Sequence, residues 1–172
     1  MVQLDDGTHK SMDTLATGDR VLVGAGQFSD VFMFSHRADD VEATFVRLTT
    51  ASNRTLTLTP DHYLYVNGAL AAAKTVSVGD ALEADDGSST HVTATSVVRG
   101  TGLYNPHTLH GDIVVDGIKT STYTTAVAPG LAHMVLAPLR MLYALGISLT
   151  DHVFDHGSDL ISAIAPPGLP KY

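Results

Sequence analysis

The sequence contains no cysteine, and only 16% of its 172 residues are charged. Without cysteine, these residues cannot form a disulfide scaffold, a thiolate zinc site or a cysteine nucleophile. Cations are also scarce, because ten Lys and Arg stand against 18 Asp and Glu, which gives a net charge of −8. Recognition of phosphate groups needs clustered cations, so we expect no nucleic-acid partner.

Residues 1–7 carry neither a basic n-region nor an apolar h-region, so they do not have the pattern of a secretory leader. We therefore expect either a cytosolic protein or a sequence whose N-terminal part is missing. Hydrophobic residues make up 44% of the chain, which is too many for a disordered protein. The length suits one domain with a sizeable core and a tail.

Most of residues 2–128 have the pattern of short β-strands. Thr and Val recur in brief, partly alternating runs at 43–48, 56–59, 91–98 and 112–115. Glycine-containing turn signals separate such runs, at 5–7, 17–19, 67–68, 78–80, 85–87 and 115–117. Many short strands with few helical patterns predict an all-β body over residues 1–128.

Residues 129–150 differ from the body because Leu, Met and Ala dominate them. This composition predicts one or two helical segments around Pro138. The apolar run is shorter than a bilayer span, and Arg140 interrupts it. Two interpretations stay open: a helix packed on the body, or a helix that contacts a membrane surface or lipid. Residues 151–172 are polar and then rich in proline, which predicts a loose C-terminal segment.

An internal repeat relates two stretches of the body at an offset of 61 residues. The offset places Gly7, Gly18, Asp19 and Gly26 on Gly68, Gly79, Asp80 and Gly87. It also brings Thr59 onto Thr120 and His62 onto Tyr123. Chance agreement is the alternative in a chain so rich in turns. We interpret the repeat as two β-subdomains related by a pseudo-two-fold axis, so that a site between them would use residues of both.

The segment Thr59-Pro60-Asp61-His62 follows a predicted strand and is the first candidate for chemistry. Pro60 lacks a backbone donor and keeps Thr59 out of the α region, so we expect the strand to end near Thr59 and turn back. Across such a turn, the hydroxyl could orient a peptide nitrogen, and the imidazole could protonate that nitrogen as it leaves.

Three other histidines suggest further chemistry. His36 follows an apolar run and either caps a strand end or acts as a base at the mouth of a pocket. His107 and His110 have the spacing of a metal pair, which leaves a β-rich metal-dependent hydrolase as an alternative. No third ligand is evident from the sequence, so we expect no metal ion and no other cofactor.

Several of these segments together resemble the Hint domain of hedgehog proteins, an autoprocessing module related to inteins. The resemblance runs in family order from Val2 to about Leu149. It is carried by residues 15–22 (LATGDRVL), 34–37 (FSHR), 56–62 (LTLTPDH), 111–117 (GDIVVDG) and 131–140 (LAHMVLAPLR). It implies a Hint fold, an all-β disc of two β-subdomains related by a pseudo-dyad, which agrees with the repeat.

The resemblance also implies a self-cleavage mechanism. An N-terminal cysteine attacks the preceding carbonyl and converts the peptide into a thioester, which a sterol hydroxyl or another nucleophile then cleaves. Thr59 and His62 match the pair that strains and protonates the scissile amide. His36 stands where many relatives have an aspartate that activates the incoming nucleophile, which leaves the acceptor open. Thr122 stands where animal relatives have a second cysteine, and it is expected to line the site.

In the family, the nucleophilic cysteine lies shortly before the position of Met1, so we expect this sequence to begin after it. The chain alone is then expected to be inactive, as part of an autoprocessing protein. The alternative is a non-catalytic Hint-like binding or scaffold module. Expected partners are the upstream segment of the same polypeptide, a sterol or lipid nucleophile, and a membrane surface at the tail. The location is unknown, and the family alone suggests the secretory route.

Overall fold

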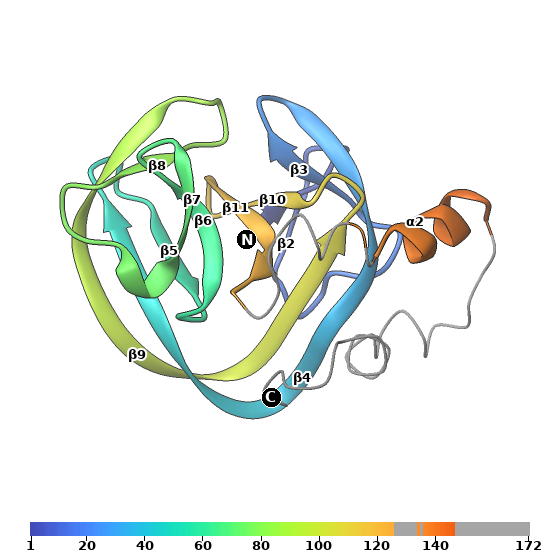
Figure 1. Ribbon diagram of the computed structural model, residues 1–172, viewed down its shortest axis with the longest axis horizontal. Helices are drawn as coiled ribbons and strands as arrows, with labels where there is room; N and C mark the ends of the chain where they lie inside the picture. The colour runs from blue at the N-terminus through green and yellow to red at the C-terminus, as the bar shows by residue number, and fades with distance from the viewer. Residues whose placement is uncertain (126–133, 135, 147–172) are drawn as a thin grey trace.

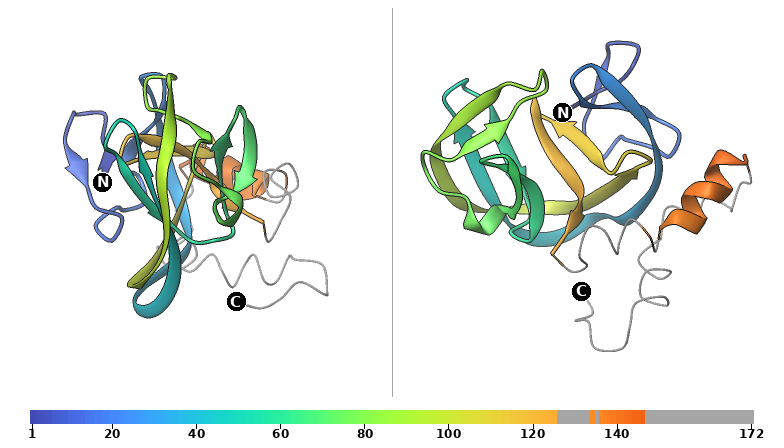
Figure 2. Two further views of the ribbon diagram at one scale, coloured as in Figure 1. Left: turned by 90° about the vertical axis from the view of Figure 1, so that its left-hand side faces the viewer. Right: turned by 45° about the horizontal axis from the view of Figure 1, so that its top comes forward.

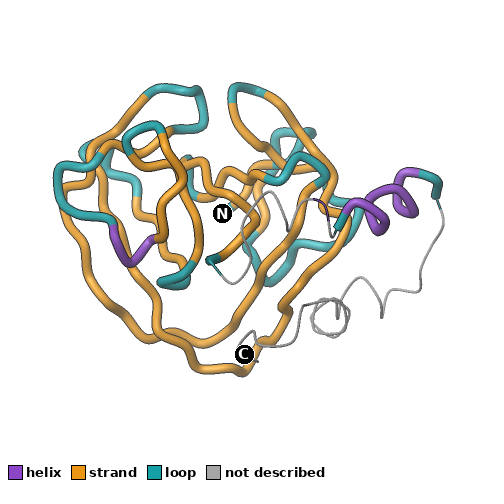
Figure 3. Tube along the Cα trace, in the orientation of Figure 1, coloured by secondary structure: helices purple, strands orange, loops and turns teal. Residues whose placement is uncertain are grey.

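The computed structural model describes residues 1–125, 134 and 136–146. Within these residues nearly all regular structure is strand, as Figure 3 shows. The strands are β1 (Val2–Gln3), β2 (His9–Lys10), β3 (Arg20–Gly24), β4 (Gln27–Thr50), β5 (Thr55–Leu58), β6 (His62–Val66), β7 (Ala69–Ala72), β8 (Ala81–Glu83), β9 (Ser89–Thr108), β10 (Asp112–Val115) and β11 (Ile118–Thr124). The helical elements are a 3-10 turn, η1 (Ala73–Thr75), and α2 (Ala137–Ala144). The prediction of an all-β body is therefore confirmed.

The strands form one nine-stranded sheet and a separate two-stranded sheet of β1 and β2. The order in the large sheet is β10-β11-β6-β8-β9-β4-β3, with β5 on β4 and β7 on β6. The long strands β4 and β9 pair antiparallel and curve together along the lower edge of the molecule in Figure 1, so they join its two sides. Because β3 also contacts β10, the two ends of this order meet and the sheet nearly closes on itself.

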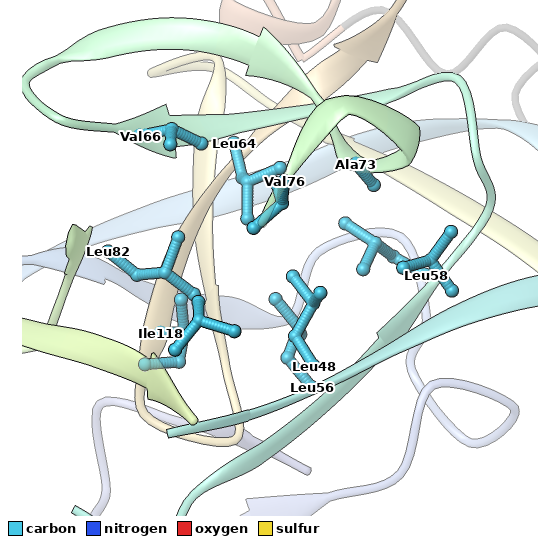
Figure 4. Packing of buried hydrophobic residues seen from close by; sticks show 11 residues of the cluster. Leu48, Leu56, Leu58, Leu64, Val66, Ala73, Val76, Leu82 and Ile118 are labelled. Atoms are coloured by element: carbon cyan, nitrogen blue, oxygen red, sulfur yellow. The ribbon is translucent and has the colours of Figure 1, made fainter. Parts of the chain in front are cut away.

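Three hydrophobic clusters hold the fold together. The first, drawn in Figure 4, lies among β4, β5, β6, β8, β9 and β11 and is centred on Leu48, Leu56, Leu64, Leu82 and Ile118. The second joins β1, β3, β4 and β10 through Val2, Leu15, Val21, Val31, Phe34 and Ile113. The third lies under α2 and contains Phe32, Met33, Tyr123, Leu136 and Leu139. Each fully buried Leu or Phe contributes about 1.5–3 kcal/mol through removal of apolar surface from water.

The 61-residue repeat is visible in the backbone hydrogen bonds. Gly18 N–H donates to the Val31 carbonyl at 2.8 Å, and Gly79 N–H donates to the Val92 carbonyl at the same distance. The Asp19 and Asp80 carboxylates likewise accept from the backbone three residues earlier, each at 2.8 Å. The core follows the same offset, because Leu15, Val21 and Val31 of one cluster correspond to Val76, Leu82 and Val92 of the other. The two halves are thus built on one plan.

The helix α2 lies within the segment predicted to be helical and packs on the outside of the body (Figures 1 and 2). Leu136 and Leu139 are buried against the body, whereas Met141 and Leu145 are 65% and 63% exposed. Among the described residues, no helix is long and apolar enough to cross a membrane. The remainder of the predicted tail, residues 129–133, 135 and 147–172, lies outside the described residues.

Candidate functional site

The turn between β5 and β6 positions Thr59 and His62 together. β5 ends at Leu58, and the N–H of His62 donates to the Thr59 carbonyl at 3.1 Å, which closes the turn around Pro60. The Lys74 ammonium donates to the Asp61 carboxylate at 2.6 Å, and this bond lowers the pKa of Asp61. The strand therefore ends and turns where the proline predicts, and a surface ion pair supports the turn.

The ring of His62 has a defined orientation. Its Nε2 lies 2.7 Å from the Ser121 carbonyl oxygen, which can only accept, so Nε2 carries the proton and Nδ1 is left as the acceptor. Burial lowers the pKa of His62, and the bond to Ser121 opposes that effect. At neutral pH the imidazole is therefore uncharged, with one lone pair available to a peptide N–H.

Two hydroxyl groups of β11 face the same region. Thr122 is buried, and its Oγ1 donates to the Gly111 carbonyl at 3.0 Å. Thr120 is also buried and donates to the Ile113 carbonyl at 3.1 Å. Each hydroxyl proton is engaged by a backbone carbonyl, so these hydroxyl oxygens can accept further hydrogen bonds.

His36 lies on β4 immediately after an irregularity in the strand. The register between β4 and β9 shifts between Phe34 and His36, so Ser35 is an extra residue in the strand. Such a bulge bends a strand and changes the direction of the following side chain. His36 is exposed, yet partial desolvation lowers its pKa, so its imidazole is neutral at pH 7 and can accept a proton.

One cavity of about 280 Å³ brings the four predicted residues together. His36, Thr59, His62 and Thr122 all line it, and they come from β4, the β5–β6 turn, β6 and β11. The apolar part of the wall includes Phe45, Leu56, Leu58, Leu103, Pro106, Ile113 and Val115. Among the described residues that line the cavity there is no Asp, Glu, Lys or Arg. The cavity is thus apolar and uncharged, with two neutral imidazoles and several hydroxyl groups.

The start of the chain lies beside one wall of this cavity. The Asp116 N–H, at the β10–β11 turn, donates to the Met1 carbonyl at 2.9 Å. Val2 packs with Ile113, which itself lines the cavity. A peptide that enters the fold at Met1 therefore runs next to β10, between the two halves (Figure 1).

Two polar residues near the site were not predicted as parts of it. Asn105 lines the cavity and pairs with His36 across the β4–β9 ladder. His107, which the sequence suggests as one member of a metal pair, is only 4% exposed and packs between the rings of Phe32 and Tyr123. Burial lowers the pKa of His107 to about 3, so its ring is neutral. The sequence of β9 has the pattern of a Thr-rich strand with Pro106 near its end. Nothing in this pattern indicates that Asn105 pairs with His36.

The metal-site alternative finds no support in the geometry. Within the part of the chain that the structure describes, no group of three or more His, Asp or Glu side chains could hold a metal ion. His110 is turned toward Asp112, with Nδ1 3.4 Å from the carboxylate. The structure therefore gives His107 and His110 no shared ligand geometry.

The C-terminal helix connects to the site through Tyr123. The Arg140 guanidinium donates to the Tyr123 hydroxyl at 3.3 Å, and the Tyr143 hydroxyl donates to Asp30 at 3.4 Å. Tyr123 belongs to β11, one residue after Thr122, and its ring contacts His107. Of the two interpretations of the tail, packing on the body accounts for these contacts, and contact with lipid stays a prediction.

Comparison with known proteins reveals clear relatives. The family model for the Hint module matches residues 1–159. The chain is 36% identical to a protein hedgehog of Drosophila virilis, over 83% of the chain and 32% of that protein. It is 31% identical to a Sonic hedgehog protein of Xenopus laevis, over 96% of the chain and 40% of that protein. The chain thus spans 32% to 40% of the length of these relatives.

Solved structures share the architecture. The gp41-1 intein superposes with a TM-score of 0.62 over 70% of this chain and 91% of that chain, at 13% identity. A bacterial intein-like domain from Clostridium thermocellum gives a TM-score of 0.59 over 70% and 93%, at 17% identity. At such low identity the comparison establishes the fold alone.

Proposed function

Since the chain belongs to the Hint module family, with hedgehog proteins among its relatives, we propose that it is the autoprocessing domain of a larger precursor. In this proposal it cleaves the peptide bond to an upstream segment of the same polypeptide and passes that segment to a nucleophile. The observation that supports it most is that His36, Thr59, His62 and Thr122 line one cavity whose described lining has no charged residue.

The first step is an acyl shift that needs a cysteine shortly before Met1. The thiol sulfur attacks the carbonyl of the preceding residue, a C–S bond forms, and the C–N bond breaks. Thr59 orients the scissile peptide, and the neutral His62 passes the thiol proton to the leaving nitrogen. The position of His62 suits this role, because its Nε2 is held by the Ser121 carbonyl at 2.7 Å and Nδ1 is left for the substrate.

The second step transfers the acyl group from the thioester to an acceptor. His36, neutral and exposed at the rim, takes the proton of the incoming nucleophile. Thr122 lines the cavity without reacting, because its hydroxyl donates to Gly111. A sterol or other lipid is the acceptor that the hedgehog resemblance implies, and secretion and membrane contact through α2 are the corresponding proposals for location.

The test is restoration of cleavage. An upstream reporter segment with a Cys-Phe type junction is placed before Met1, and cleavage is followed by gel and mass spectrometry in excess dithiothreitol. We expect thiol-induced release of the reporter and its suppression by His62→Ala. His9→Ala is the matched control, because His9 is exposed on β2 and does not line the cavity.

Two results contradict the proposal. If the folded precursor stays uncut in excess thiol, the chain is a non-catalytic Hint-like binding or scaffold module. If cleavage proceeds equally well in His62→Ala, the assignment of the acid is wrong. Circular dichroism on each variant separates loss of folding from loss of chemistry.

A further inference from the structure

Asn105 lines the cavity and carries an unsatisfied hydrogen-bond acceptor. Its amide nitrogen donates to Ser35 Oγ at 2.7 Å and lies 3.4 Å from His107 Nε2. Its Oδ1 atom is buried, and among the described residues it has no hydrogen-bond partner. A buried carbonyl oxygen that lacks a donor is unfavourable, so native proteins rarely leave one unpaired. This oxygen is therefore suited to a donor that a bound molecule supplies.

His36 is a second acceptor at the same place. It pairs directly with Asn105 in the β4–β9 register and lines the same cavity. No residue in the described part of the chain makes a hydrogen bond to its ring. Side chains of directly paired residues start about 4.5–5.5 Å apart at Cβ. A small molecule located between them could donate one hydrogen to the imidazole and another to Asn105 Oδ1.

We propose that the acceptor of the second step is water, held between the His36 imidazole and Asn105 Oδ1, with Asn105 as the positioning residue. This inference rests on the proposed thioester chemistry. Water has two hydrogens and satisfies both acceptors at once. An alcohol, including a sterol, has one, so its approach to His36 leaves Asn105 Oδ1 unpaired. A primary amine has two, but at pH 7 it is an ammonium ion, and the described lining offers no carboxylate.

The resulting step is a hydrolysis. The water oxygen forms a C–O bond with the thioester carbonyl carbon while one of its protons passes to His36. The C–S bond breaks, and the cysteine sulfur leaves as a thiolate that then takes the proton from His36. The second hydrogen of the water stays on its oxygen and is bound by Asn105 Oδ1. The products are a free carboxylic acid on the upstream segment and a regenerated thiol.

The experiment uses the restored precursor in ¹⁸O-labelled water, without thiol and with cholesterol in detergent micelles as the competing acceptor. Mass spectrometry of the released segment counts acid with one ¹⁸O against sterol ester. We expect the labelled acid as the main product. Asn105→Ala is expected to slow hydrolysis about tenfold, because losing the orienting hydrogen bond to water corresponds to about 1.4 kcal/mol. Its cleavage by dithiothreitol is expected to change less than twofold.

Two controls separate positioning from a general effect on the cavity. Thr101→Ala removes a hydroxyl-bearing side chain from the same lining without touching His36 or Asn105, and it is expected to leave the ratio of hydrolysis to thiol cleavage unchanged. Ser35→Ala removes the partner that holds the amide and is expected to lower this ratio by less than Asn105→Ala does.

The outcomes distinguish the inference from the proposed function. A precursor that resists dithiothreitol contradicts the autoprocessing proposal itself. A precursor that thiol cleaves normally, but that gives mainly sterol ester, overturns the assignment of water. Equal ratios in wild type and folded Asn105→Ala overturn the role of Asn105, whatever the acceptor is.

Discussion

In one half of the molecule, the chain after Thr59 turns back at Pro60 and delivers His62 to the cavity. At the equivalent positions of the other half, 61 residues later, β11 runs on through Thr120, Ser121 and Thr122 to Tyr123. Tyr123 contacts α2 through the Arg140 guanidinium instead. The proline explains the difference, because it removes a backbone donor and ends the strand, whereas Ser121 lets the ladder continue.

The long strands show the same divergence. The repeat places His107 of β9 on Val46 of β4, and His36 of β4 on Val97 of β9. Val46 is buried in the apolar core and Val97 is 74% exposed, whereas the two histidines border the candidate site. The two halves thus share a backbone plan, but their side chains differ, and the candidate site uses histidines that the equivalent positions lack.

The largest expected effect is the loss of cleavage rate in His62→Ala, compared with a substitution of Tyr123 at the equivalent position of the other half. In the restored precursor, His62→Ala is expected to slow thiol-induced cleavage by about 10²–10⁴-fold, the usual contribution of a general acid. Tyr123→Phe, at the equivalent position, removes only the hydroxyl bound to Arg140 and is expected to cost less than threefold in rate. Gel-based cleavage rates check both, and equal losses would show that the two halves share the catalytic role.

The second prediction compares the two cores. Leu15 is fully buried in the cluster around β1 and β3, and its counterpart Val76 is 8% exposed in the other cluster. Leu15→Ala is expected to lower the free energy of unfolding by about 2–5 kcal/mol through the cavity it leaves. Val76→Ala removes fewer methylene groups and is expected to cost about 2 kcal/mol. Urea unfolding measures both, and a larger loss in Val76→Ala would reverse the predicted ranking.

The third prediction replaces His36 by valine, the residue at the equivalent position 97 of the repeat. His36→Val is expected to slow transfer to the acceptor by about 10²-fold, because it removes the base, and to leave thiol-induced cleavage within about twofold. In wild type, desolvation lowers the pKa of His36 from its ordinary value of about 6.5, so the base is active at pH 7 and transfer falls only at a pH below that ordinary value. A transfer rate that does not fall at any pH below 6.5 at which the protein stays folded would contradict this role.

The fourth prediction concerns stability in acid. His107 has a pKa of about 3 in the fold and about 6.5 when unfolded, so the unfolded chain binds a proton first. Stability from this group is therefore complete above about pH 6.5 and falls as the pH drops toward 3, by up to about 1.4 kcal/mol per unit. His107→Val introduces the residue found at the equivalent position 46. Its free energy of unfolding, measured by urea titration at several pH values, is expected to depend less steeply on pH between pH 7 and 5. Identical slopes in the two proteins would refute the assignment.

The smallest expected effect is a loss of stability in the glycine turns that the two halves share. Gly18 and Gly79 have φ of +93° and +96°, with open space where a Cβ would lie. Gly18→Ala and Gly79→Ala are each expected to cost about 1–2 kcal/mol, because an L-residue is strained in the left-handed region. In thermal unfolding, the two variants are expected to show nearly the same decrease in Tm. A large difference would show that the repeated turns do not bear equal strain.

Local chemistry made much of the site predictable. Pro60 predicts the turn that positions Thr59 and His62. The regular spacing of Gly and Asp indicates the repeat. Asn105 could not be recognised in this way. Its proposed role depends on the bulge at Ser35, and a bulge is decided by how β4 packs against its neighbours rather than by the strand's own residues.

By itself, the sequence determined the all-β class, the two-fold plan, the turn at Pro60 and the residue types available for chemistry, because turn and strand preferences act over a few residues. Only the tertiary structure decided that His36, Thr59, His62 and Thr122 share one cavity, that Asn105 pairs with His36 across the β4–β9 ladder, and that its buried Oδ1 has no partner among the described residues. It also decided that His107 is buried as a neutral ring rather than exposed for a metal. These outcomes depend on contacts between strands about seventy residues apart, whose register is set by core packing and bulges.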